Sequence, residues 1–270
     1  MSLASPVDIG QLCTWQAAWV PELSLLAWLA LAVGAVTVGI SKTAIPGASI
    51  AIALFAMVLP AKPSTAALLV LLIVGDLFAL WFYRRHADWV VLRRLVPPVL
   101  AGVAVGALFL ANASNDLVGR VIGAILSVVI LLGLWQRRRA QRHPEQVQAG
   151  QRTAWAQAAF YGSLGGFTTM VANAAGPVMS MYFLAARMPI ATFLGTSAWF
   201  FFVINLAKVP FAAGLGLFST SLLAMDLVLI PFVVLGALLG RVIAKRLSQR
   251  FFDVTVIVLS IAGAVYLLLR

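Results

Sequence analysis

Two stretches of this sequence place polar and helix-breaking residues between long apolar runs. The first, GISKTAIPGAS, contains Lys42 and the pair Pro46-Gly47. The second, TTMVANAAGP, contains the pair Gly176-Pro177. A short helix that begins after each pair would present unpaired N–H groups and the positive end of its dipole. Two such ends that converge form a site for an anion, so the two breaks predict a site for a negatively charged ligand.

Lys42 would add a full positive charge to this site, because an ionisable residue inside a membrane segment is a functional candidate by default. Hydroxyl groups, an amide and two glycines of the breaks complete the expected binding set. Its other members are Ser41, Thr43, Gly47, Thr168, Thr169, Asn173 and Gly176. The competing interpretation is structural: these residues let helices pack and turn, and Lys42 extends toward the membrane interface.

Asp76 is a carboxylate in an otherwise apolar run, about two helical turns before Arg84. A buried carboxylate without a cation partner is suited to carry a proton, whereas one with a partner forms a static ion pair. Both interpretations stay open from the sequence. Asp76 is the expected coupling residue, with the proton or another ion as the coupling ion.

Lys208 and Asp226 flank the loop GLGLFS at similar distances, on consecutive expected helices. One interpretation joins the two residues in a structural ion pair. The other has Lys208 draw anions toward the binding site. Asn205 shares the helix face of Lys208, because the two residues are three positions apart. Asn205 and Lys208 therefore join the expected binding set.

The sequence offers no combination of residues for covalent or metal-dependent catalysis. His86 and His143 both lie in basic loops and are not placed to serve a nucleophile. Cys13 is the only cysteine, so a cysteine-based metal site cannot form. We therefore expect a protein that is not an enzyme and that has no cofactor.

The composition shows what kind of protein must hold these residues. Of 270 residues, 63% are hydrophobic and 10% are charged, and the mean hydropathy is +1.03. Soluble domains carry about 25% charged residues. Apolar runs that approach or exceed the length needed to span a bilayer occupy residues 23–40, 64–83, 117–135 and 251–269. The chain is expected to be an all-α polytopic membrane protein.

The net charge of +11 follows the expected membrane topology. Thirteen of the nineteen Lys and Arg residues lie in three short segments between apolar runs, at residues 84–94, 137–152 and 241–250. Such clusters are typical of cytoplasmic loops, whereas a nucleic-acid site would need one continuous basic face. We expect the lipid bilayer as the environment of the protein and no nucleic-acid partner.

The chain divides into two related halves. The pattern P-x4-G-x3-G begins at Pro97 and again at Pro231, and the segments before it start at KPSTAALL and at MPIATFLG. The two copies lie on helices of opposite expected direction, which is typical of the inverted repeats of secondary transporters. The expected divisions are an N-terminal segment (1–22), a first membrane repeat (23–136), a basic cytoplasmic linker (137–152) and a second membrane repeat (153–270).

Each half is expected to hold five segments and to open with a broken or re-entrant helix pair. In the first half the run 23–40 is followed by the short run 49–59, and in the second half the run 154–167 is followed by 178–186. A run of ~11 residues makes about 16 Å of helix, roughly half the hydrocarbon thickness. The fold is expected to have about 8–10 transmembrane segments, depending on whether the short runs cross the bilayer.

Three further stretches carry a resemblance to a known family. They are VGDLFALWFYRRHADW (74–89), LGTSAWFFFVINLAKVPF (194–211) and LGALLGRVIAKRLSQRFF (235–252). Over roughly residues 23–269, the chain resembles the sulfite exporter TauE/SafE family, also called the 4-toluene sulfonate uptake permease family. The resemblance implies a secondary transporter of the bacterial inner membrane for small sulfur-containing anions, such as sulfite, sulfonates and organosulfonates of the sulfoacetate type. Members typically have glycine-rich breaks, whereas the breaks here have fewer glycines and an added lysine, Lys42.

These observations combine into one expected mechanism. The anion is held between the two breaks, and the halves rock about it to give alternating access. The alternative is a transporter or channel for another small anion, such as a carboxylate. The expected partners are a small anionic substrate, the bilayer and a coupling ion such as the proton, and a homodimer is compatible with the sequence.

Overall fold

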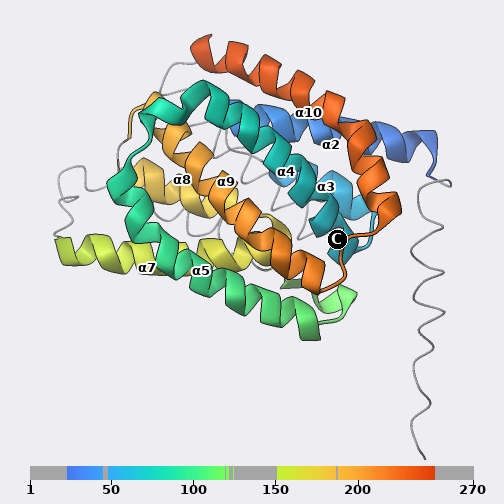
Figure 1. Cartoon of the computed structure of the whole chain (residues 1–270), viewed down its shortest axis with the longest axis horizontal. Coiled ribbons are helices and arrows are strands. Elements are labelled where there is room, and N and C mark those ends of the chain that lie inside the picture. The colour runs from blue at the N-terminus through green and yellow to red at the C-terminus, as the bar shows by residue number, and fades with distance from the viewer. Residues whose placement is uncertain are drawn as a thin grey trace, which may run out of the picture.

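The computed structural model describes residues 23–44, 48–118, 120, 121, 124, 151–186 and 188–246. The regular elements in this part of the chain are all helices (Figure 1), which confirms the expected all-α architecture. The predicted run 251–269, most of the run 117–135 and the pair Pro46-Gly47 lie outside the described residues.

Within the described residues, five helices are long and apolar enough to cross a membrane. They are α2 (Leu25–Thr43), α4 (Ala61–Tyr83), α5 (Trp89–Asn112), α9 (Ile190–Gly214) and α10 (Thr220–Arg246). Each coincides with an apolar run of the sequence, and large side chains such as Leu26, Trp81 and Leu227 are exposed on their outer faces. Soluble proteins rarely expose apolar surface on this scale. The chain is a polytopic membrane protein.

The described helices follow the same order twice: a long helix, a short helix and two long helices. The elements not yet named are α3 (Ser49–Val58), the 3-10 turn η1 (Arg84–His86), α7 (Gln151–Ala172) and α8 (Ala175–Ala185). The short helices α3 and α8 have 10 and 11 residues, about half of what spans a bilayer. Pro60 directly precedes α4 and Pro189 directly precedes α9. Pro60 therefore corresponds to Pro189 when the two helices are aligned. The sequence pattern instead aligns Pro63, in the stretch KPSTAALL, with Pro189.

The last long helix of each half packs against the first helix of the other half. α10 lies along α2 at one edge of the molecule, α5 lies along α7 at the opposite edge, and α4 and α9 lie between them (Figure 1). A Cβ atom added at Gly39 would overlap the carbonyl of Val233, and one added at Gly166 would overlap that of Val99. Val99 and Val233 each follow by two residues the proline that starts the P-x4-G-x3-G pattern. The repeated pattern thus makes the same close helix contact in both places.

α4 and α9 run antiparallel through the centre of the molecule. Gly195, near the start of α9, lies against the last residue of α4, and Asn205 lies beside Asp76 further along both helices. Asp76 follows Pro60 by 16 residues, and Asn205 follows Pro189 by the same number. The contact between α4 and α9 thus joins two residues at the same distance from the proline that precedes each helix.

The helices that lead into the breaks extend further than expected. α2 runs through Thr43, so Ser41 and Lys42 belong to its last turn. α7 likewise includes Thr168 and Thr169. The hydroxyl groups in these turns bond to carbonyls one turn earlier, a local contact that a helix accommodates. The breaks begin after these residues and not at them.

The second break is confined to the two residues between α7 and α8. Asn173 has a left-handed backbone (φ 54°), and its N–H bonds to the carbonyl of Thr169 (3.0 Å), while the following N–H bonds to that of Thr168 (3.2 Å). The first of these bonds is the 5→1 bond of the αL type of helix end, in which asparagine can replace glycine. α8 begins at once, so Gly176-Pro177 lies inside its first turn, where a proline needs no N–H.

Candidate functional site

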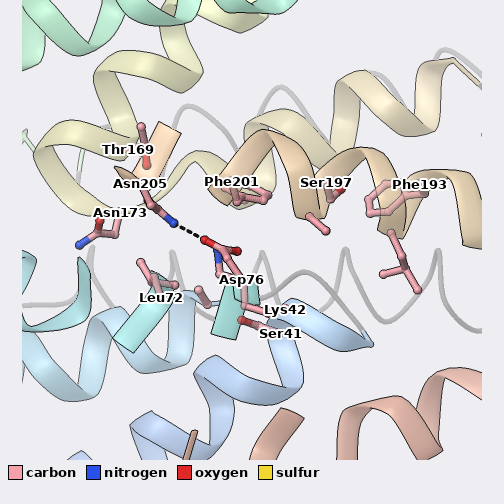
Figure 2. Close-up of a pocket in the computed structure, with 14 residues that line it drawn as sticks. Ser41, Lys42, Leu72, Asp76, Thr169, Asn173, Phe193, Ser197, Phe201 and Asn205 are labelled. Atoms are coloured by element: carbon pink, nitrogen blue, oxygen red, sulfur yellow. Dashed lines mark hydrogen bonds and ion pairs between the residues drawn. The ribbon is translucent and has the colours of Figure 1, made fainter. Parts of the chain in front are cut away.

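A pocket lies between the two halves, where the breaks meet α4 and α9. It encloses about 530 Å³ of unfilled space, its open mouth included. Seven of the residues predicted from the sequence line it: Ser41, Lys42, Asp76, Thr169, Asn173, Gly176 and Asn205. The structure thus brings several polar residues from both breaks to one place, as Figure 2 shows.

The starts of both short helices face this pocket. Ala48, the residue before α3, and Gly176, in the first turn of α8, both line it. The first N–H groups of a helix have no partner within the helix, and the helix dipole places its positive end there. The pocket therefore receives two positive helix ends, one from each half.

Lys42 and Asp76 form an ion pair at the pocket. Lys42 Nζ lies 2.8 Å from Asp76 Oδ1, with the lysine side chain 8% exposed and the aspartate fully buried. The same Nζ lies 4.3 Å from the centroid of the Phe201 ring, within the range of a cation–π contact. Gly75 leaves room for the lysine stem, because a Cβ there would lie 2.9 Å from Lys42 Cγ. Lys42 therefore points into the core, and the interpretation that it extends to the membrane interface is wrong.

A chain of hydrogen bonds continues from Asp76 into the second half. Asn205 Nδ2 donates to Asp76 Oδ2 (2.7 Å), as Figure 2 shows, and Asn205 Oδ1 accepts from Lys208 Nζ (3.1 Å). Lys208 Nζ also donates to Thr169 Oγ1 (3.2 Å) and to Asn173 Oδ1. Lys208 is 2% exposed and lies behind the lining residues. It supports the pocket and does not line it.

The expected ion pair between Lys208 and Asp226 is wrong. Asp226 is buried, and its carboxylate oxygens have no hydrogen-bond partner among the described residues. The physical reason is the packing of α10, which lies mainly against α2 and α4, whereas Lys208 faces α7. α9 and α10 are consecutive in the sequence but are not close neighbours, because α10 packs on the helices of the first half.

Two of the predicted threonines hold helices and do not line the pocket. Thr43 Oγ1 lies 3.0 Å from the carbonyl oxygens of both Gly39 and Ala237, which ties α2 to α10. Thr168 Oγ1 donates to a carbonyl of the preceding turn of α7 (3.2 Å). Gly47 lies outside the described residues, so its predicted role stays a prediction.

The sequence-based site did not include most of the face that α9 presents to the pocket. Phe193, Ser197, Phe201 and Asn205 line it, and Figure 2 shows them along one side. These residues recur every four positions, which places them on a single face of a helix. That spacing, counted back from Asn205, is the signal that could have found them.

The buried network has one more cation than anion when both lysines are protonated. It contains Lys42, Lys208 and Asp76, and within the described residues no second carboxylate lies within 4 Å of either lysine. A buried charge is stable only when it is paired, so the network favours an anion in the pocket. The described part of the chain shows no cluster of three His, Cys, Asp or Glu residues that could hold a metal ion.

A comparison with known families identifies the family of this chain. The model of the family described as sulfite exporter TauE/SafE matches residues 23–267. No curated protein and no solved structure gives a significant match. The matched range spans every helix described above, and members of the family are membrane transporters and not enzymes. This chain belongs to the sulfite exporter TauE/SafE family.

Proposed function

We propose that this protein is a secondary transporter that carries a small sulfur oxyanion, such as sulfite or a small organosulfonate, across a bacterial inner membrane. Its family supports this class of protein and cargo. The observation that carries the proposal is the pocket between the halves, where Lys42 meets the starts of α3 and α8. Each of these three features favours an anion.

In this proposal the oxyanion is held by Lys42 and by hydrogen-bond donors from both halves. Thr169 accepts a bond from Lys208, which leaves its own hydroxyl proton for a ligand in the pocket. Unpaired N–H groups at the starts of α3 and α8 supply further donors. Leu72 and Phe193 form apolar walls for the organic part of a sulfonate.

We infer that the two halves form an inverted repeat that rocks about the bound anion. α4 and α9 are equivalent helices that run antiparallel, and the contact of α10 with α2 is equivalent to that of α5 with α7. In transporters built from inverted repeats, the substrate site lies where the repeats meet. The pocket at Asp76 and Asn205 has this position.

Asp76 is the proposed coupling residue. An oxyanion that binds Lys42 competes with the Asp76 carboxylate for the same ammonium group. A buried carboxylate that loses its cation partner is strongly disfavoured unless it takes up a proton. The anion and a proton would therefore bind together and cross the membrane in the same direction.

The proposal is tested by the binding of anions to the purified protein. Sulfite, sulfoacetate and methanesulfonate are expected to raise the melting temperature, because a ligand that binds only the folded state stabilises it by mass action. Lys42→Gln is expected to abolish this rise. Glutamine removes the charge and keeps a polar partner for Asp76, so the carboxylate is not left alone.

Lys245→Ala is the matched control, because Lys245 lies exposed in the last turn of α10, and it should respond like the parent. A Lys42→Gln variant that still responds like the parent would remove Lys42 from the site. A rise in melting temperature with acetate or succinate, but not with sulfur oxyanions, would indicate a carboxylate transporter instead.

A further inference from the structure

Lys208 occupies a position that would suit a dissolved cation. Its Nζ is surrounded by three oxygens of neutral groups: Thr169 Oγ1, Asn173 Oδ1 and Asn205 Oδ1. Within the described residues no carboxylate lies within 4 Å of this nitrogen. The side chain is 2% exposed, so solvent does not compensate its charge. We call these three oxygens the oxygen cage.

The oxygen cage also lies where interrupted helices bind cations. Thr169 belongs to the last turn of α7, and Asn173 ends that helix with a left-handed backbone. The C-terminal end of a helix carries the negative end of its dipole and favours positive charge. In transporters with interrupted helices, coupling cations bind at such ends, and anionic substrates bind at helix starts. Here the end of α7 and the start of α8 are two residues apart.

The oxygen cage is directly connected to the pocket. Thr169, Asn173 and Asn205 all line the pocket on one side and accept from Lys208 on the other. The ammonium group thus fixes the orientation of three groups that face a ligand. Its charge also acts on the pocket, because Lys42 is already balanced by Asp76.

We propose that the ammonium group of Lys208 is a tethered counter-cation, which takes the place that a co-transported monovalent cation such as sodium would occupy. This inference rests on the proposed function and adds that anion binding needs no dissolved metal cation beside the coupled proton. The oxygens that would coordinate sodium hold the ammonium group, and the group is attached to the chain, so it does not diffuse away as a free cation would.

Lys208→Ala tests the proposal, because it empties the oxygen cage and leaves a space that n-propylammonium matches. In choline chloride this variant should bind sulfite about tenfold more weakly or worse, since charge-assisted bonds are lost. Sodium or n-propylammonium should restore most of the loss. Tetramethylammonium, which cannot donate a hydrogen bond, should restore none. The parent should bind sulfite equally well in choline chloride and in sodium chloride.

Lys208→Met is the matched variant, because it fills the same space without the charge and should lose sulfite binding with no rescue by any cation. Melting temperatures measured without sulfite report whether a cation binds in the oxygen cage, independently of anion binding. Sodium and n-propylammonium should raise the melting temperature of Lys208→Ala and leave that of Lys208→Met unchanged.

Any of three results would overturn the proposal that Lys208 is a tethered cation. The first is a parent protein that needs sodium to bind sulfite. The second is a Lys208→Ala variant that binds sulfite like the parent in choline chloride, and the third is a Lys208→Ala variant whose sulfite binding no cation restores. A parent that binds no oxyanion in any salt, together with a sodium-stabilised Lys208→Ala variant, would refute the proposed function and support the oxygen cage.

Discussion

At the scale of single residues, the charges beside the pocket determine what can bind there. Lys42 and Asp76 neutralise each other at 2.8 Å, and Lys208 is held by neutral oxygens alone. Removing one member of a buried ion pair typically costs about 3–5 kcal/mol, because the other charge is left unpaired. We therefore propose that an anion that displaces Asp76 from Lys42 binds together with a proton.

Asp76→Asn is expected to separate anion binding from proton coupling. The amide removes the competitor for Lys42 and can still accept from Asn205, so the variant should bind methanesulfonate at least as well as the parent. In reconstituted vesicles, an acidic exterior should accelerate methanesulfonate uptake by the parent and leave uptake by Asp76→Asn unchanged. Methanesulfonate keeps its charge over the pH range, so the gradient acts on the protein. A variant whose uptake still follows the pH gradient would show that another group carries the proton.

The charged and amide residues of the site could be predicted from the sequence, but their partners and the α9 face with Phe193, Ser197 and Phe201 could not. Lys42, Asp76, Asn205 and Lys208 stand out because a polar group inside an apolar run must find a partner. The expected pair of Lys208 with Asp226 failed because it assumed that consecutive helices are neighbours. The last long helix of each half packs against the first helix of the other half, and this packing decides which side chains can pair. No local pattern in the sequence indicates which helix is the partner.

At the scale of the helices, close backbone contacts at glycines hold α2 against α10 and α7 against α5. A methyl group at Gly39 would overlap the backbone of Val233 and Ala237, which cannot yield unless α10 moves. Gly39→Ala is therefore expected to lower the melting temperature in detergent, with an overpacking penalty of about 1–3 kcal/mol.

Gly214→Ala is the matched control for this substitution, because nothing lies within 4 Å of the Cβ position at Gly214. It should melt within error of the parent. If Gly39→Ala and Gly214→Ala melt at the same temperature, then α2 and α10 are not in close contact.

The positions of the long helices could be predicted from the sequence, whereas their ends at the breaks could not. The apolar run 64–83 locates α4 (Ala61–Tyr83) to within three residues, since a bilayer requires long apolar helices with every backbone bond made internally. Ser41 and Thr168 were expected in the breaks because they are polar, yet their hydroxyls bond within the helix. The true end of α7 depends on the left-handed backbone of Asn173, a conformation that many asparagines do not adopt.

At the scale of the whole molecule, the long helices described by the structure form two edges and a centre. α2 with α10 and α5 with α7 form the edges, and α4 with α9 lies between them (Figure 1). The hydrogen bond from Asn205 to Asp76 crosses the centre at the pocket. Movement of one edge relative to the other would change which side of the membrane the pocket faces, as alternating access requires.

Counterflow in proteoliposomes tests this arrangement most directly. Vesicles loaded with unlabelled methanesulfonate are diluted into a trace of labelled methanesulfonate, and a carrier then accumulates label inside transiently by exchange. The parent and Lys245→Ala should show saturable counterflow, and Lys42→Gln should show none. Conductance without counterflow would contradict alternating access and indicate a channel, and counterflow by Lys42→Gln equal to that of the parent would contradict an anion site at the pocket between the halves.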